Sequence, residues 1–254
     1  MERQLSKDKL LETAEKVGKR IKERFPGSGL SRVAAEIVEI TKGAIVRAES
    51  ISRPNVWLRG GLVVVLLIAV AGAVSYFQTR TDGKSAWQAA VEFLDVTKGS
   101  TAVLGAVAIF LFTLETRLKR RRALEAVHEL RAVAHLIDMR QLAKDPDRLG
   151  DPTDPVNVEG RALDAEGLGR YLHFCTELLA VVSKIGQLYV QDFPDSTAVT
   201  AVDHFEGLAT GLSNKIWQKL MILDRSRSDA EDGTAEVPPA TVDPARQRES
   251  PPPP

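Results

Sequence analysis

GLVVVLLIAVAGAVSYF, residues 61–77, is the stretch that decides the predicted fold, because it contains no charged residue. A helix needs about 20 consecutive apolar residues to cross the hydrocarbon core of a bilayer. The uncharged segment runs from Gly60 to Thr79 and meets that length. Trp57 stands at its entry and Tyr76 at its exit, and their rings favour the boundary between lipid and water. The sequence therefore predicts a transmembrane helix over residues 56–79.

A second uncharged stretch, TAVLGAVAIFLFTL at residues 101–114, follows after a short connection. It is near the lower limit for a span, but Lys98 and Arg117 can extend their charged ends outward and lengthen it. We expect a second transmembrane helix over residues 99–117. A re-entrant or interfacial helix is the alternative. The residues between the two stretches, 80–98, are predicted to form a short external loop.

Basic residues gather outside this predicted hairpin. They are Lys42, Arg47, Arg53 and Arg59 before the first stretch, and Arg117, Lys119, Arg120, Arg121 and Arg122 after the second. Because lysine and arginine mark the cytoplasmic side of a membrane helix, both termini are predicted to be cytoplasmic. The sequence thus predicts a multi-pass protein of the inner membrane. The cluster at 117–122 is predicted to be a lipid-facing anchor, with membrane lipids as its partners.

Small residues recur at helical spacing in both stretches. They are Ala69, Gly72 and Ala73 in the first, and Ala102, Gly105 and Ala106 in the second. Small side chains allow helix backbones to approach closely, so these positions are candidates for helix packing, either within the hairpin or in a homo-oligomer. Ordinary membrane composition, in which alanine and glycine are common, is the alternative explanation.

Neither stretch contains an ionisable residue, which argues against ion-coupled transport. An oligomeric pore lined by an uncharged span remains open, since a hydrophobic constriction can gate without charges. The layout of two spans with an amphipathic N-terminal helix is similar to that of mechanosensitive channel hairpins. The likeness is architectural, because their pore-lining motifs are not identifiable in this chain.

Outside the hairpin the sequence predicts helices. Apolar residues at spacings of three and four indicate an amphipathic pair over residues 1–55, which can form a hairpin, a coiled coil or a membrane-surface layer. Residues 118–224 are predicted to form a three-helix cytoplasmic bundle, with a helix that continues to about Ala143 and two more over about 164–191 and 197–223. The serine-, acid- and proline-rich segment 225–254 is predicted to be disordered.

The charges are unevenly distributed although the formal net charge is zero. Residues 1–59 hold 13 basic and 8 acidic side chains, whereas residues 144–254 hold 11 basic and 19 acidic ones. An acidic distal region does not suit a nucleic-acid partner.

No catalytic or cofactor motif accompanies these helices. The candidates for a metal site are the four histidines, His128, His135, His173 and His204, but the carboxylate–x–x–His pair of bundle metal sites occurs once, before His128. The sole cysteine, Cys175, lies in an apolar run and is predicted to be a buried structural thiol. We therefore expect no catalytic residues, no metal and no cofactor.

Together these patterns predict an all-α membrane protein with a transmembrane hairpin, an N-terminal helical pair and a C-terminal bundle. The leading functional hypothesis is a non-enzymatic scaffold or signalling partner that presents helical surfaces, as a homo-oligomer or with another protein. The alternatives are an oligomeric channel subunit and a metal-binding or enzymatic bundle.

Overall fold

The computed structural model describes residues 5–53, 56–80, 86–149, 153 and 155–235; at helical positions 52, 56–59, 73, 76–80, 86–90, 92–102 and 230–235 it describes the backbone alone. Its elements are α1 (Lys7–Arg24), α2 (Gly29–Ser52), α3 (Val56–Arg80), α4 (Ala86–Leu142), the 3-10 turn η1 (Pro146–Arg148), β1 (Asn157–Val158), β2 (Arg161–Ala162), α5 (Ala165–Gln191) and α6 (Ser196–Ala235). The prediction of a helical fold is confirmed.

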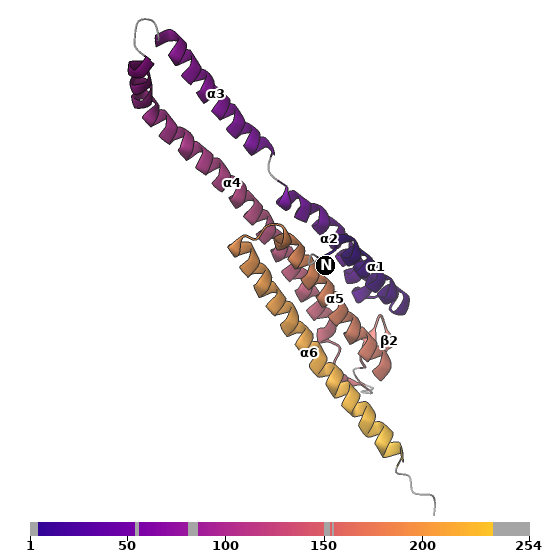
Figure 1. Ribbon diagram of the computed structural model, residues 1–254. Coiled ribbons are helices and arrows are strands. Elements are labelled where there is room, and N and C mark those ends of the chain that lie inside the picture. Colours follow the sequence, from indigo (N-terminus) through magenta and orange to yellow (C-terminus); the bar gives the residue numbers. More distant parts are fainter. Residues whose placement is uncertain (1–4, 54–55, 81–85, 150–152, 154, 236–254) are drawn as a thin grey trace, which may run out of the picture.

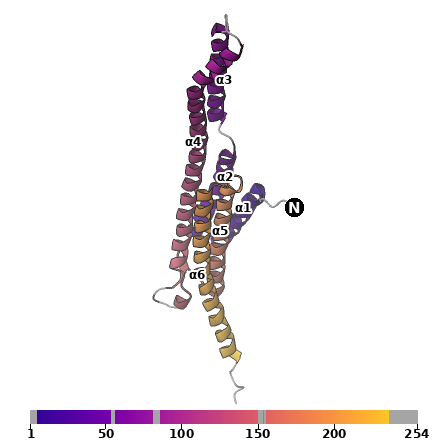
Figure 2. The same ribbon diagram turned by 60° about the vertical axis from the view of Figure 1, so that its left-hand side comes forward.

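The molecule is elongated and has two parts (Figures 1 and 2). A bundle is formed by α1, α2, α5, α6 and the C-terminal part of α4. A narrow arm extends from one end of this bundle and consists of α3 beside the N-terminal part of α4. We use the name "arm" for residues 56–80 and 86–114.

The N-terminal helices pack against each other as a hairpin, one of the three arrangements that the sequence left open, and they also join the bundle. Ser6 and Ser28 cap α1 and α2 through their hydroxyls, as expected of serine before a helix. The apolar stripe of α1, which includes Val17 and Ile21, is buried. Both helices contact α5, and α2 also contacts α4. The expected three-helix bundle is therefore a bundle of five helices, because α1 and α2 cover apolar faces that three helices leave open.

Helix α5 is the centre of the bundle. Asp164 caps it by accepting a hydrogen bond from the Gly167 amide at 2.7 Å, which confirms the predicted start of this helix. Side chains on several of its faces are buried, among them Leu172, Leu178 and Ile185. This follows from its neighbours, since α5 packs against α1, α2, α4 and α6.

Two connecting or terminal regions differ from the sequence prediction. Helix α6 continues to Ala235, so residues 225–235 are helical and not disordered. Its extension carries no proline and no glycine before Gly233, and its residues therefore permit the helix to continue. Residues 236–254, the rest of the predicted disordered tail, lie outside the described residues. The predicted loop at 144–160 contains η1 and leads into a hairpin of β1 and β2, turned by Glu159 and Gly160 at positive φ.

The predicted membrane hairpin is contradicted. Within the part of the chain that the structure describes, no helix combines the length and the apolar character needed to cross a bilayer. Over their described residues, α3 and α4 do not reach the roughly 20 consecutive apolar residues that a span requires. The fold class is corrected from an all-α membrane protein to an all-α protein.

The predictions that depended on two spans change with it. The inner-membrane localisation, with both termini cytoplasmic, is not supported, and the channel hypothesis stays an untested prediction. The external loop predicted over 80–98 is also different, because α4 begins at Ala86 and continues without a break to Leu142. One helix therefore belongs both to the arm and to the bundle.

Candidate functional site

The predicted lipid anchor at 117–122 lies on α4 where the arm joins the bundle. Three of its five basic residues pair with acidic side chains of the protein. Lys119 contacts Glu115 at 3.1 Å, and Arg121 contacts Glu125 at 2.8 Å. Arg117 and Arg122 are exposed and form no ion pair within the described residues. The structure therefore gives most of this cluster a role inside the protein.

Arg120 makes the most specific of these contacts. Its Nε and Nη2 donate to the Asp195 carboxylate at 2.9, 3.1 and 2.6 Å. The Asp195 side chain is buried and also accepts from the Ala198 amide at the start of α6. The guanidinium of Arg120 lowers the pKa of Asp195, and the backbone hydrogen bond acts in the same direction. This pair fixes the base of the arm to the connection between α5 and α6.

The small residues proposed for helix packing lie in the arm. Among the described residues, a Cβ atom added to Gly72 or Gly105 would meet nothing within 4 Å, so no described contact between α3 and α4 requires either glycine. Ala69 is half-buried, and Ala106 is exposed. Ala73 and Ala102 lie outside the residues whose side chains are described. Gly72 and Gly105 therefore face open space among the described residues of a single chain.

The four histidines do not form a cluster that could bind a metal ion within the described residues. His128, His135, His173 and His204 are all exposed, and the described residues contain no group of three or more potential ligands that could hold a metal ion. His173 instead contacts Glu177 at 3.3 Å along α5. Cys175 is fully buried, as predicted, and burial raises the pKa of its thiol to about 12.

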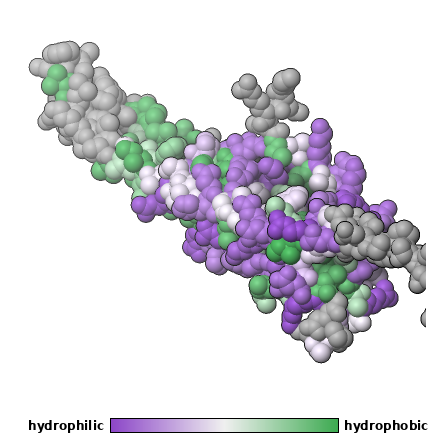
Figure 3. All heavy atoms as spheres, turned by 90° about the horizontal axis from the view of Figure 1, so that it is seen from below, coloured by the Kyte–Doolittle hydropathy of each residue, from purple (hydrophilic) through white to green (hydrophobic). Residues whose placement is uncertain are grey.

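The arm presents the most conspicuous surface of the molecule. Figure 3 shows hydrophobic side chains gathered along its described part and mainly hydrophilic ones over the bundle. Ile68 is 67% exposed and Phe112 73% exposed, although such residues are normally buried. The other exposed large apolar side chains of the arm are Val63, Val64, Leu66, Leu67, Val70, Val74, Val91, Val103, Ile109 and Phe110.

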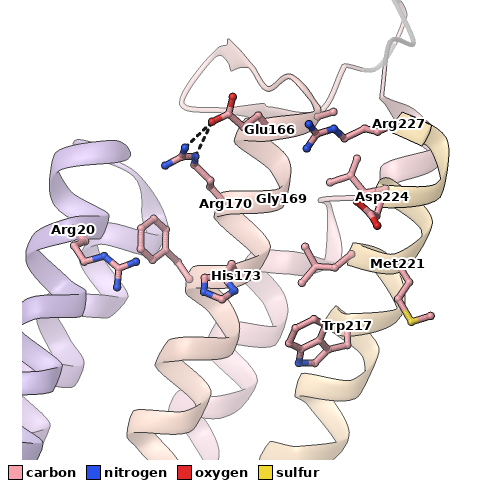
Figure 4. A pocket seen from close by; sticks show the side chains of 13 residues that line it. Arg20, Glu166, Gly169, Arg170, His173, Trp217, Met221, Asp224 and Arg227 are labelled. Atoms are coloured by element: carbon pink, nitrogen blue, oxygen red, sulfur yellow. Dashed lines mark hydrogen bonds and ion pairs between the residues drawn. The ribbon is translucent and has the colours of Figure 1, made fainter. Parts of the chain in front are cut away.

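A second feature is a cavity of about 510 Å³ between α5 and α6, beside α1 (Figure 4). Arginines 20, 170 and 227 line it together with Phe174 and Trp217. No motif in the sequence predicts this site. Its residues come from α1, α5 and α6, and the only local signal was a tryptophan among polar residues in the middle of α6.

Comparisons of the chain with protein-family models, with curated proteins and with solved structures found no match. The two features above, the apolar arm and the cavity, are therefore the basis for the functional proposals.

Proposed function

We propose that this chain is a non-enzymatic scaffold that pairs with a second copy of itself through the arm and presents a helical bundle on each side of the junction. The observation that carries the proposal is the row of exposed aliphatic and aromatic side chains on α3 and α4. Monomeric proteins rarely leave contiguous apolar patches of more than a few hundred square ångströms in water.

The size of the arm fits this purpose. Helix α3 has 25 residues, which corresponds to a length of about 37 Å. Two helices side by side are about 20 Å wide, so one face of the arm covers about 700 Å². A standard protein–protein interface buries about 800 Å² on each partner. One face of the arm is thus close to what a stable dimer needs.

A second copy is the occupant that the charge pattern favours. No charged residue lies between Gly60 and Thr79 or between Gly99 and Leu114. An uncharged apolar face is complementary to itself, so two copies can meet around a two-fold axis without like-charge repulsion. Gly72 and Gly105, which face open space, allow another helix to approach closely.

The test is the oligomeric state of the full chain, measured by light scattering and sedimentation over a concentration series. We expect a dimer for the wild type and a monomer for the double variant Ile68→Glu/Phe112→Glu. Met139→Glu is the matched control, because Met139 is also an exposed apolar residue but lies in the bundle part of α4. It should remain dimeric.

Two results would overturn the proposal. One is a wild-type monomer at every concentration. The other is flotation of the wild type with lipid vesicles together with loss of flotation in the double variant, which would assign the arm to lipid and not to a second copy.

A further inference from the structure

The cavity between α5 and α6 is formed by two facing stripes. Glu166, Gly169, Arg170 and His173 follow one another at spacings of three or one on α5, and Trp217, Met221, Asp224 and Arg227 do so at spacings of four and three on α6. Residues three and four apart lie on one face of a helix, so each stripe is one wall. The helices come close at the Gly169 position, where an added Cβ would lie 3.4 Å from Leu223 Cδ2.

The interior of the cavity is apolar. Phe174 and Leu223 are buried and form its base, with Leu220 beside them. The Trp217 ring lies between α5 and α6 in Figure 4, and 53% of the residue is exposed. A large aromatic ring left partly in water beside a cavity offers stacking area to a ligand. The volume lies within the roughly 300–1,000 Å³ of small-molecule sites.

Two of the three arginines are already neutralised. Arg170 donates to Glu166 at 2.9 and 2.7 Å. Arg20 contacts Glu177 at 3.2 Å and lies over the Phe174 ring, 5.2 Å from its centre. These pairs leave little net charge at that side of the cavity.

Arg227 and Asp224 are the charged groups that remain. Within the described residues, neither forms an ion pair or a hydrogen bond through its side chain. In Figure 4 the Arg227 side chain extends from α6 toward α5, and Asp224 lies on the same side of α6. Their Cβ atoms are expected to be about 5–6 Å apart, because the residues are three apart on a helix. A contact between two such exposed groups would gain little in water, so both groups are available to a ligand.

We propose that this cavity binds a zwitterion with an apolar body, of the class of α-amino acids with large aromatic or aliphatic side chains. Arg227 receives the carboxylate, Asp224 receives the ammonium group, and the apolar body lies against Trp217 and Phe174. One cationic and one anionic group above an apolar base match a ligand that carries both charges at one end. The proposal is independent of the arm and of the second copy.

Titration calorimetry on the full chain tests the charge requirement with related probes. Phenylalanine, tryptophan and leucine carry both charges, 3-phenylpropionate carries only the carboxylate, and 2-phenylethylamine carries only the ammonium group. We expect phenylalanine to bind at least about fivefold more tightly than either singly charged analogue, as one charge-assisted hydrogen bond provides.

Variants assign each charge to its residue. Arg227→Gln should weaken phenylalanine binding by about fivefold or more and leave 2-phenylethylamine unchanged. Asp224→Asn should weaken phenylalanine similarly and leave 3-phenylpropionate unchanged. Arg225→Gln is the matched control, because Arg225 is exposed on the same helix but does not line the cavity. Circular dichroism confirms that each variant is folded.

The proposal is overturned if none of the three amino acids binds at millimolar concentration. It is also overturned if the singly charged analogues bind as tightly as phenylalanine, or if Arg225→Gln and Arg227→Gln have equal effects. Trp217→Ala provides an independent check: it should weaken all the aromatic probes together, since it removes the stacking surface and neither charge.

Discussion

Gly186 on α5 is a position where one added methyl group should destabilise the bundle. A Cβ at this residue would lie 3.2 Å from Phe205 Cδ1 on α6 and 3.7 Å from Leu130 Cδ1 on α4. The contact with Phe205 is tighter than ordinary van der Waals distance, and both neighbours are fully buried. Alanine at this position therefore forces a shift at the junction of three helices.

Two opposing effects set the magnitude for Gly186→Ala. Overpacking a core costs about 1–3 kcal/mol. Replacing glycine by alanine inside a helix contributes about 0.8–1 kcal/mol in favour of folding. The net change expected for Gly186→Ala is therefore a loss of about 1 kcal/mol in the free energy of unfolding.

Gly207→Ala on α6 separates these effects. Nothing lies within 4 Å of a Cβ added there, so only the helix-propensity gain remains. We expect Gly207→Ala to stabilise the protein by about 0.5–1 kcal/mol. The difference between the two variants then measures the packing cost alone. Urea unfolding followed by circular dichroism gives both values.

A third variant tests the named neighbour. Phe205→Leu shortens the side chain that the new methyl group would meet, so Gly186→Ala should cost less in the Phe205→Leu background than in the wild type. Equal stabilisation by Gly186→Ala and Gly207→Ala would refute the packing of α4, α5 and α6 described above.

Three further predictions concern a cap, an acid-sensitive pair and the thiol. Ser28→Ala should cost about 0.5–2 kcal/mol, because the buried Ser28 hydroxyl accepts from the Ser31 amide at 3.0 Å; Ser6→Ala, at an exposed cap with a 3.4 Å contact, should cost less in the same urea assay. The pKa of Asp195 is lowered in the folded state by Arg120, so its stabilising contribution is present above the unfolded pKa and is lost as the pH falls through the lower folded value. Asp195→Asn should therefore flatten the acid side of the stability–pH curve, and an unchanged curve would contradict the pair. Burial raises the pKa of the Cys175 thiol to about 12, so alkylation near pH 8 should be slow in the native protein and rapid in urea; equal rates would place this thiol at the surface.

Helix boundaries could be predicted where the chain carries local signals. Asp164 marks the start of α5 because its carboxylate can accept from an amide three residues later, and this signal needs no tertiary contact. The end of α6 carried a misleading signal. The polar composition after Leu223 predicted disorder, but arginine, alanine and glutamate in this segment are all compatible with a helix.

The partners of an apolar face could not be predicted in the same way. Periodicity shows that Val17 and Ile21 must be covered, but it does not show by which helix. In the structure α1 contacts both α2 and α5, so its apolar stripe is part of the main core. The cavity was hidden for the same reason, since Arg20, His173 and Trp217 meet only after three helices have packed.

In the arm, the composition correctly indicated a strongly apolar surface, but the prediction of transmembrane helices drawn from it was wrong. The long uncharged stretches indicate that side chains such as Ile68 and Phe112 favour a non-aqueous contact. Both residues are exposed in the single chain, so such a contact is still open to them. The stretches do not indicate whether lipid, another helix or a second copy makes this contact, because the hydrophobic effect is not directional and acts with any apolar neighbour. Within the described residues α3 and α4 cover each other on one side only. The apolar area left on the other sides is what the glutamate substitutions test, and the bundle control at Met139 shows whether the effect belongs to the arm.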